Sequence, residues 1–310
     1  MLHALVLGAA AGGGFPQWNS NDDASRRAHA GDPKARPLTQ SSIAVSADGR
    51  RWAVLNASPD LRQQINENRQ LHPAADGPKR ASPIASVVLT NADVDHVTGL
   101  LSLRESQPLA IYAHPRVLTV LAANSIFNVL NPEFVDRRPL PIDAPVELSD
   151  KQGDPLGITV KAFTVPGKIA LWLEQANVAG FGTQEGDTIG LEISAKGSPS
   201  IFYIPGCSEM PESLADRLRG AGVVFFDGTL WRDDEMIQAG LGVKTGQRMG
   251  HLSCSGPDGT IALFENLGVR RKIFIHINNS NPLLLADSAE RREAAEHGWE
   301  IAFDGMEIVL

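Results

Sequence analysis

The sequence predicts an α/β fold in which two β-sheets pack face to face and helices cover their outer faces. Three observations lead to this expectation. Short apolar segments typical of strands recur along the chain, several are followed by helical patterns, and hairpin-like pairs occur in both halves. Hydrophobic residues make up 43% of the 310 positions, which is enough for a large core. No long linker divides the chain, so we expect residues 1–310 to form one domain.

The first forty residues combine one strand with a long polar segment. Residues 1–8 have the apolar pattern of a strand. They lead into Gly12-Gly13-Gly14, which indicates either a tight turn or a backbone that another group approaches closely. Residues 19–40 are polar and rich in turn-forming residues, so we expect a long surface loop there.

Strands and helices then alternate up to residue 124. Strands are predicted at 42–45 and 51–55, joined by a turn at Asp48-Gly49. The segment Asn56-Ala57-Ser58-Pro59-Asp60 opens a helix, because proline suits a first helical turn. Further along we expect a strand at 84–89, a helical pattern through Leu103, a strand at 111–113 and a helix at 116–124.

Strand patterns dominate from residue 140 on, and helices return in the last third. The expected strands lie at 146–148, 158–165, 169–173, 189–193, 200–204, 223–226 and 272–277. The expected helices lie at 212–218, 256–265 and 289–296. Segments 301–303 and 306–310 are predicted to pair as a closing hairpin.

Charge and cysteine content argue against several classes of protein. The formal net charge of −8 disfavours nucleic acid or an anionic membrane as the main partner. No apolar run approaches the length of a membrane span. The two cysteines, Cys207 and Cys254, are too few for a disulfide framework or a thiolate zinc cage. We therefore expect a reducing compartment, the cytoplasm.

The most informative feature is Asn91-x-Asp93-x-Asp95-His96, which follows directly after the apolar strand at 84–89. It places three ligand-type side chains within four residues. A tight loop at a strand end can aim alternate side chains at one point, and layered folds place their sites at such ends. The alternative is that Asp95 and His96 cap the helix that follows.

Further candidates occupy similar positions. Asp227 ends the strand at 223–226 and His276 interrupts the strand at 272–277, while the others are His251, Lys168 and the asparagines at 278, 279 and 281. Each also has a plain structural interpretation, since a lone histidine in a strand is usually a core residue and a lone aspartate usually caps a helix or forms a turn. Their recurrence at strand ends favours a site.

The ordered set of polar strand ends resembles the metallo-β-lactamase superfamily. Asn91-x-Asp93-x-Asp95-His96 is similar to a degraded His-x-His-x-Asp-His motif, and Tyr203-Ile204-Pro205-Gly206-Cys207 resembles the strand that ends in a metal-bridging aspartate. Asp227, His251 and His276 match an acidic residue and two histidines of the phosphodiesterase branch. The resemblance implies the four-layer αββα sandwich of that superfamily.

A closer resemblance, over essentially the whole chain, is to the pyrroloquinoline quinone (PQQ) biosynthesis protein B family, PqqB. Its most specific stretches are Gly12-Gly13-Gly14-Phe15-Pro16-Gln17-Trp18-Asn19, Thr39-Gln40-Ser41-Ser42, Asn56-Ala57-Ser58-Pro59-Asp60, Phe226-Asp227-Gly228-Thr229-Leu230-Trp231, His276-Ile277-Asn278-Asn279 and Phe303-Asp304-Gly305-Met306. Many members of that family carry a Cys-x-Cys-x-x-Cys cluster that resembles a zinc site, where this chain has Ser20, Asp22 and Ser25. We therefore expect residues 19–36 to be a degenerate zinc-binding segment without a thiolate-bound zinc, either mobile or held by other contacts.

The resemblance also implies a metal centre. In the superfamily two ions lie side by side, and the positions of the first ion's ligands are Asn91, Asp93 and Lys168 in this chain. An asparagine is a poor ligand for a transition metal, and an ammonium places positive charge where the cation would lie. The first site is thus expected to be dismantled, with the lysine standing in for its charge.

The ligand positions of the second ion are Asp95, His96 and His276, and all three are of ligand type. Two imidazoles and one carboxylate, with the other coordination positions open, form the arrangement of non-haem Fe(II) oxygenases. Hydrolysis by a two-metal clamp needs a second ion about 3.5–4 Å away. We expect Fe(II) with dioxygen as co-substrate, and zinc as an ion that the purified protein can carry.

Supporting roles are expected for the remaining candidates. Asp93 adds a weaker ligand or binds a water, and Asp227 ligates the metal or holds a histidine from behind. His251, together with Asn278 and Asn279, handles protons or positions an acidic substrate. Lys168 and the glycine-rich loop bind carboxylates.

The PqqB resemblance implies a hydroxylase that oxidises the tyrosine-derived ring of a glutamate–tyrosine crosslinked precursor of PQQ. The alternative is a non-catalytic carrier or transport-assisting protein on a retired hydrolase scaffold. A third and weaker alternative is zinc-dependent hydrolysis. The expected partners are the small-molecule precursor and other proteins of PQQ biosynthesis.

Overall fold

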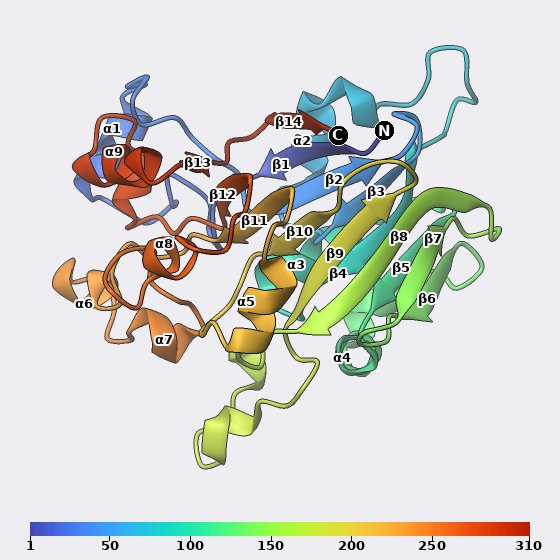
Figure 1. Ribbon diagram of the computed structural model, residues 1–310. Coiled ribbons are helices and arrows are strands. Elements are labelled where there is room, and N and C mark those ends of the chain that lie inside the picture. Colours follow the sequence, from blue (N-terminus) through green and yellow to red (C-terminus); the bar gives the residue numbers. More distant parts are fainter.

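The computed structural model describes residues 1–310 as two seven-stranded sheets packed face to face, with helices outside them (Figure 1). Across the first sheet the order is β14 (Glu307–Val309), β1 (His3–Gly8), β2 (Ser42–Ser46), β3 (Trp52–Leu55), β4 (Ile84–Leu89), β5 (Leu109–Ala113) and β6 (Val135–Pro139). Across the second it is β13 (Trp299–Ile301), β12 (Arg271–Ile275), β11 (Val223–Asp227), β10 (Ile201–Ile204), β9 (Ile189–Ala195), β8 (Pro155–Thr164) and β7 (Pro145–Ser149). The predicted αββα sandwich is confirmed.

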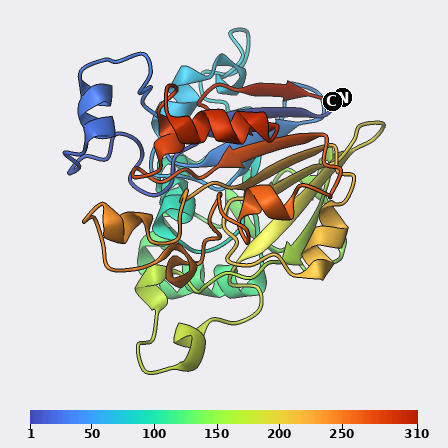
Figure 2. The ribbon, with the colours of Figure 1, turned by 60° about the vertical axis from the view of Figure 1, so that its left-hand side comes forward.

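The helices lie on the outer faces of the two sheets and in the loops at one end (Figures 1 and 2). They are α1 (Asp23–His29), α2 (Leu61–Glu67), α3 (Val94–Val97), α4 (Pro115–Ala123), α5 (Glu212–Leu218), α6 (Glu235–Gln238), α7 (Gly246–Met249), α8 (Thr260–Leu263) and α9 (Ala289–Glu296). Short 3₁₀ turns lie at Arg69–Leu71, Thr98–Leu103, Ser125–Val129, Leu171–Leu173, Ala179–Gly182 and Pro282–Leu284. None of these helices has the length and apolar character needed to span a membrane.

Strand β4 shows how the layers pack. Val87 and Leu89 belong to an apolar cluster shared with Leu61 of α2 and Leu121 of α4, on the outer face of the first sheet. Val88 belongs instead to the large cluster shared with the second sheet. A parallel strand that is buried on both faces reads as a continuous apolar run, which is the pattern of this segment.

The carboxyl ends of parallel strands from both sheets meet at one end of the sandwich. Strands β3 to β6 are parallel to one another, and so are β10 to β13. The loop after β1 ties the two sheets together there, because Ala11 N donates to Ile277 O and Ile277 N donates to Ala9 O. Residues that follow β4, β10, β11 and β12 are thereby brought to the same place.

The predicted closing hairpin is wrong. Strand β13 pairs with β12 in the second sheet, whereas β14 pairs with β1 in the first. Ala302 N still donates to Phe274 O, but Gly305 N already donates to Val6 O. The chain therefore crosses from one sheet to the other within four residues, and the last strand closes the edge of the first sheet.

Three other local predictions need correction. The expected strand at 169–173 is a loop with a 3₁₀ turn, because Ile169 N and Leu171 N donate to side chains and not to a neighbouring strand. The expected surface loop at 19–40 contains α1, which Asp22 caps through Ser25 N. The helix expected at 256–265 is only the single turn α8.

Candidate metal centre

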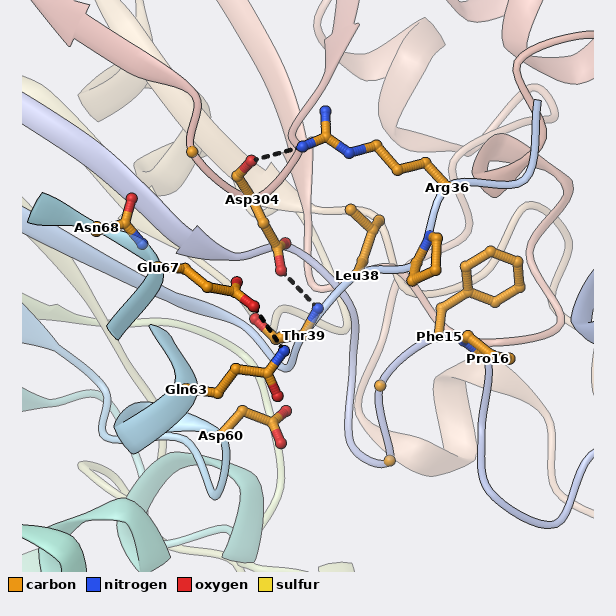
Figure 3. Close-up of a pocket in the computed structure, with 14 residues that line it drawn as sticks. Phe15, Pro16, Arg36, Leu38, Thr39, Asp60, Gln63, Glu67, Asn68 and Asp304 are labelled. Atoms are coloured by element: carbon orange, nitrogen blue, oxygen red, sulfur yellow. Dashed lines mark hydrogen bonds between the residues drawn. The ribbon is translucent and has the colours of Figure 1, made fainter. Parts of the chain in front are cut away.

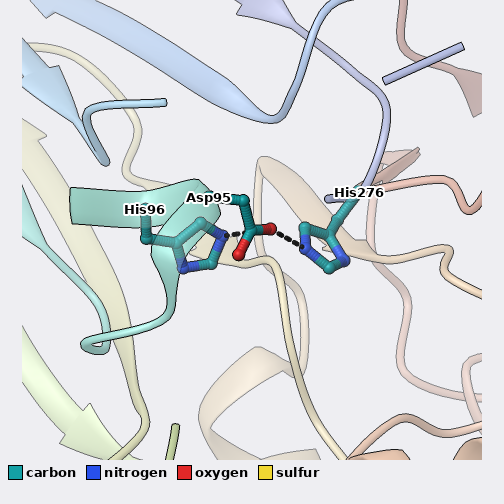
Figure 4. A group of neighbouring side chains, drawn as sticks. All are labelled: Asp95, His96 and His276. Atoms are coloured by element: carbon teal, nitrogen blue, oxygen red, sulfur yellow. Dashed lines mark hydrogen bonds and ion pairs between the residues drawn. The ribbon is translucent and has the colours of Figure 1, made fainter. Parts of the chain in front are cut away.

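Asp95, His96 and His276 bring their ligand atoms together where β4 and β12 end (Figure 4). Asp95 Oδ2 lies 3.1 Å from His276 Nε2 and 3.8 Å from His96 Nε2. The ligand atoms of the three residues all lie within 4.8 Å of one another. Asp95 and His96 are consecutive residues of α3, whereas His276 is 181 positions away from Asp95, so only the fold unites them.

The imidazole of His96 is buried and has one ring nitrogen free. Its Nδ1 lies 2.7 Å from Asn91 Oδ1, while its Nε2 has no hydrogen-bond partner. A buried polar atom without a partner is unfavourable, and a bound cation would satisfy it. Burial lowers the pKa of His96, which favours the neutral imidazole that can ligate a metal. The residues present therefore fit a metal ion.

The carboxylate of Asp95 and the imidazole of His276 form an ion pair. Burial alone would raise the pKa of Asp95, but its interactions with His96 and His276 outweigh burial and lower that pKa. Burial likewise opposes charging of His276, yet the hydrogen bond and charge of Asp95 raise its pKa. His276 also adopts a φ of 61°, a conformation that costs a non-glycine residue about 1–3 kcal/mol. Such strain at a strand end is typical of functional sites.

A second group, Asp227, His251 and His276, shares His276 with the first. Asp227 is fully buried, and its Oδ2 lies 2.7 Å from His251 Nδ1 and accepts a hydrogen bond from Cys207 N. Its Oδ1 accepts hydrogen bonds from the backbone N–H and the hydroxyl of Thr229. The rings of His251 and His276 stack at a centroid distance of 5.3 Å. The structure thus places Asp227 against His251, a histidine outside the group of Asp95, His96 and His276.

The structure does not bring Asp93 or Lys168 into either group. Asp93 Oδ1 accepts a hydrogen bond from Leu171 N, and its Oδ2 accepts one from the amide of Asn91. Lys168 Nζ lies 3.2 Å from Glu174 Oε1. The charge of Lys168 is therefore directed to a neighbouring carboxylate, and Asp93 anchors the 3₁₀ turn at Leu171–Leu173 to the start of α3.

Asn279 connects the site to the polar segment that contains Ser20, Asp22 and Ser25. Its Oδ1 accepts a hydrogen bond from Gln17 N, and its Nδ2 donates to Asp22 Oδ2 at 3.0 Å. Asp22 also accepts hydrogen bonds from the hydroxyls of Ser20 and Ser25. Ser20, Asp22 and Ser25, the positions compared with the family's cysteine cluster above, are therefore joined to one another by hydrogen bonds, and Asn279 holds α1 against the loop that follows His276.

The glycine run approaches the metal centre closely. A Cβ atom on Gly12 would lie 3.5 Å from the carboxylate of Asp95. Gly13 and Gly14 adopt φ values of 95° and 71°, in a turn that Gly14 N closes onto Ala11 O. Both interpretations of the run therefore hold, since it is a tight turn and a close approach. Cys207 contributes no ligand atom, because its thiol donates to Glu209 O.

Two clefts of about 520 Å³ open near the site. One is lined by His251 together with Arg232, Gln247, Ser253 and Ser255. The other lies beside Gly13 and Gly14 and is lined mainly by polar residues, among them Arg36, Asp60, Glu67 and Asp304 (Figure 3). Only the first cleft contains a residue of the two ligand groups, His251, and neither cleft is lined by Asp95, His96 or His276.

Comparison with known proteins identifies the family. Residues 51–277 match the model of the beta-lactamase superfamily domain. Over 308 residues the chain is 56% identical to "Coenzyme PQQ synthesis protein B" of Gluconacetobacter diazotrophicus, with 99% of both chains covered. The chain belongs to the coenzyme PQQ synthesis protein B family. A relative of the same name from Xanthomonas oryzae is 50% identical over 309 residues, and all of both chains is covered.

Solved structures agree with this membership. The crystal structure of Zn(2+)-bound PqqB from Methylobacterium extorquens matches with a TM-score of 0.92 and 46% identity, covering 99% of this chain and all of that one. A diphosphatase of the PhnP family matches with a TM-score of 0.69 but only 20% identity, so it shows the fold alone. The PqqB relative was thus obtained with zinc, a metal that suits the donor set described above.

Sequence analysis missed two side chains that organise the site. Thr229 belongs to Phe226–Trp231, one of the segments that resemble the PqqB family. Its position two residues after Asp227 is the feature of the sequence that could have marked it as part of the site. The sequence marks Asn91 only as a lost ligand position, whereas the structure places its amide oxygen against His96. Neither contact follows from spacing alone, because each depends on how a loop turns back.

Proposed function

We propose that this chain is an iron- and dioxygen-dependent hydroxylase in PQQ biosynthesis. The observation that carries the proposal is the grouping of one carboxylate and two imidazoles, Asp95, His96 and His276, around one point. This donor set is that of non-haem Fe(II) oxygenases, which leave coordination positions open for dioxygen and substrate. The names of its relatives support the pathway.

The residues where a second ion would bind favour oxidation over hydrolysis. A two-metal hydrolase needs ligands for both ions, about 3.5–4 Å apart. Here Asn91 is hydrogen-bonded to His96, Asp93 is occupied by Leu171 N, and Lys168 is paired with Glu174. With these side chains committed elsewhere, one ion is the occupancy that the donor set supports.

When bound, iron would activate dioxygen next to the substrate. The chain's own side chains would bind and orient the substrate. His251 borders the cleft of about 520 Å³, and Asp227 fixes its Nδ1, so its Nε2 is the ring atom left to exchange a proton with a phenol. Arg232 lines the same cleft and makes no ion pair, so it is available to a substrate carboxylate. The proposed substrate is the tyrosine-derived ring of a glutamate–tyrosine crosslinked precursor.

The stoichiometry of the hydroxylation determines which reagents the assay must contain. One atom of dioxygen enters the ring in place of hydrogen and the other leaves as water, so two electrons must come from an added reductant such as ascorbate. Protein loaded with Fe(II) under anaerobic conditions should consume dioxygen with the precursor, and the product should gain one oxygen by mass spectrometry. His276→Ala should abolish both signals.

The matched control is His29→Ala, which removes an exposed histidine of α1 and should leave turnover unchanged. Full turnover by His276→Ala would exclude the proposed centre. Tight binding of the precursor or of PQQ by the wild type, with no dioxygen uptake, would favour the alternative of a carrier protein. Ester or phosphodiester turnover by the zinc-loaded protein would favour hydrolysis.

A further inference from the structure

We propose that Asn91 and Thr229 are positioning residues of the metal centre, which hold His96 and His276 with their Nδ1 atoms protonated. Nε2 is then the ring atom of both histidines that can ligate an ion beside Asp95, once His276 gives up the Nε2 proton that it donates to Asp95. This inference deepens the proposed function and rests on the same ligand set. It assigns roles to one residue at a lost ligand position and to one hydroxyl outside the motif.

The amide of Asn91 has only one orientation that satisfies its neighbours. Its Oδ1 accepts a hydrogen bond from Asp93 N at 3.0 Å, and its Nδ2 donates to Asp93 Oδ2 at 3.2 Å. A flipped amide would oppose donor to donor and acceptor to acceptor. The oxygen is therefore the atom that lies 2.7 Å from His96 Nδ1. Since an amide oxygen only accepts, His96 Nδ1 must carry the hydrogen.

Protonation of Nδ1 leaves the lone pair of the neutral His96 on Nε2. This is the buried nitrogen that lacks a partner and lies 3.8 Å from Asp95 Oδ2. A histidine ligand is normally oriented in this way, with its second nitrogen donating to an acceptor behind it. Asn91, at a ligand position of the lost ion, thus orients His96 toward the ion that the remaining site would bind.

Thr229 has the same role for His276 through a longer chain of hydrogen bonds. Its hydroxyl lies 2.6 Å from Asp227 Oδ1 and 3.0 Å from the backbone oxygen of His276. The hydroxyl donates to Asp227, because a buried carboxylate is a stronger acceptor than a backbone carbonyl. With its only hydrogen committed, Oγ1 can only accept from His276 Nδ1 at 2.8 Å. His276 Nδ1 is therefore a donor, and Nε2 is the atom that faces Asp95 at 3.1 Å.

This network also argues against a second ion between Asp227, His251 and His276. The facing atoms there are already matched donor to acceptor, with Asp227 Oδ2 lying 2.7 Å from His251 Nδ1 and Thr229 Oγ1 lying between Asp227 and His276. An ion would break these hydrogen bonds in a site that is fully buried at Asp227. The second group is thus the support of the first.

The test compares Thr229→Val with Thr229→Ser. Valine keeps the shape but lacks the hydroxyl, whereas serine retains it. Zinc affinity, measured by competition with a chromophoric chelator, should fall about 10–100-fold in Thr229→Val and stay within about threefold of wild type in Thr229→Ser. Asn91→Leu should weaken zinc binding by a similar factor. The visible absorption of bound Co(II) should change in the same two variants, because their imidazoles reorient.

A readout on the wild type keeps the inference testable if a variant fails to fold. In zinc-loaded protein labelled with [¹⁵N]histidine, the ring correlations of His96 and His276 should show protonated Nδ1 and metal-bound Nε2. Zinc bound through Nδ1, or wild-type affinity and Co(II) spectrum in Thr229→Val, would overturn the proposed roles. Correct tautomers without dioxygen uptake would instead refute the hydroxylase while the positioning roles stand.

Discussion

Replacing Asp95 by asparagine should remove most of the metal affinity without changing the shape of the site. The carboxylate oxygen lies 3.1 Å from His276 Nε2 and 3.8 Å from His96 Nε2, so an ion bound by both imidazoles lies within about 4 Å of it. At that separation a carboxylate and a divalent ion attract by about 8 kcal/mol at an effective dielectric constant of about 20, and desolvation of the two charges offsets about half of this. Since each 1.4 kcal/mol is tenfold, we expect zinc affinity to fall about a thousandfold.

The assay is zinc competition at neutral pH, with thermal unfolding to verify that the variant folds. The control is Asp76→Asn, which makes the same change in charge at an exposed position and should leave affinity unchanged. If Asp95→Asn binds zinc within a few-fold of wild type while folded, the carboxylate is not a ligand. The interpretation of the three-residue group as a metal centre would then be wrong.

Three further outcomes follow from the packing and the charges. Gly99→Ala should lower the free energy of unfolding by about 3 kcal/mol in urea, because the new Cβ would lie 2.1 Å from a backbone oxygen. The control Gly242→Ala meets nothing closer than 3.4 Å and should change that free energy little. Equal stability of the two variants would contradict this expectation. Burial raises the pKa of Asp304 to about 6, so the folded state binds its proton more tightly than the unfolded state. The free energy of unfolding should therefore fall by about 2–3 kcal/mol as pH rises from about 4 to 6, and Asp304→Asn should remove that fall; an unchanged pH profile in the variant would refute the assignment. The hydrogen bond from Arg248 lowers the pKa of Glu174 to about 2, so Glu174 is ionised and forms ion pairs at neutral pH. Glu174→Gln removes these ion pairs and should speed chymotryptic cleavage in the segment 171–183. An unchanged cleavage rate would show that the ion pairs do not hold that segment.

The layers and the strand ends could be predicted from sequence because burial leaves a pattern there. The buried strand at 84–89 is apolar throughout, and the polar residues that follow it stand out against that run. His276 follows another strand, β12, and only its position in the chain marks it as a candidate. The resemblance to a known family supplied the connection between them, and the structure supplied their distance.

The features that sequence analysis missed depend on contacts between distant segments. The last strands carry the alternation of a hairpin, but β1 and β12 offer each of them a better edge. Helix α1 is short and polar, and it is held by Asn279, which is more than 250 positions away. The amide of Asn91 and the hydroxyl of Thr229 acquire their partners only when α3 and the loop after β11 fold back. The local sequence pattern indicates which residues are buried and where the chain turns. It does not indicate which distant residue a polar side chain will contact.

The most direct test of the proposed function is a single turnover under ¹⁸O₂. Protein with one equivalent of Fe(II) is mixed with the precursor, ascorbate and labelled dioxygen, and the product is analysed by mass spectrometry. We expect one ¹⁸O atom in the product ring for each turnover, and none with Asp95→Asn. Recovery of bound but unlabelled precursor from iron-loaded wild type would contradict it.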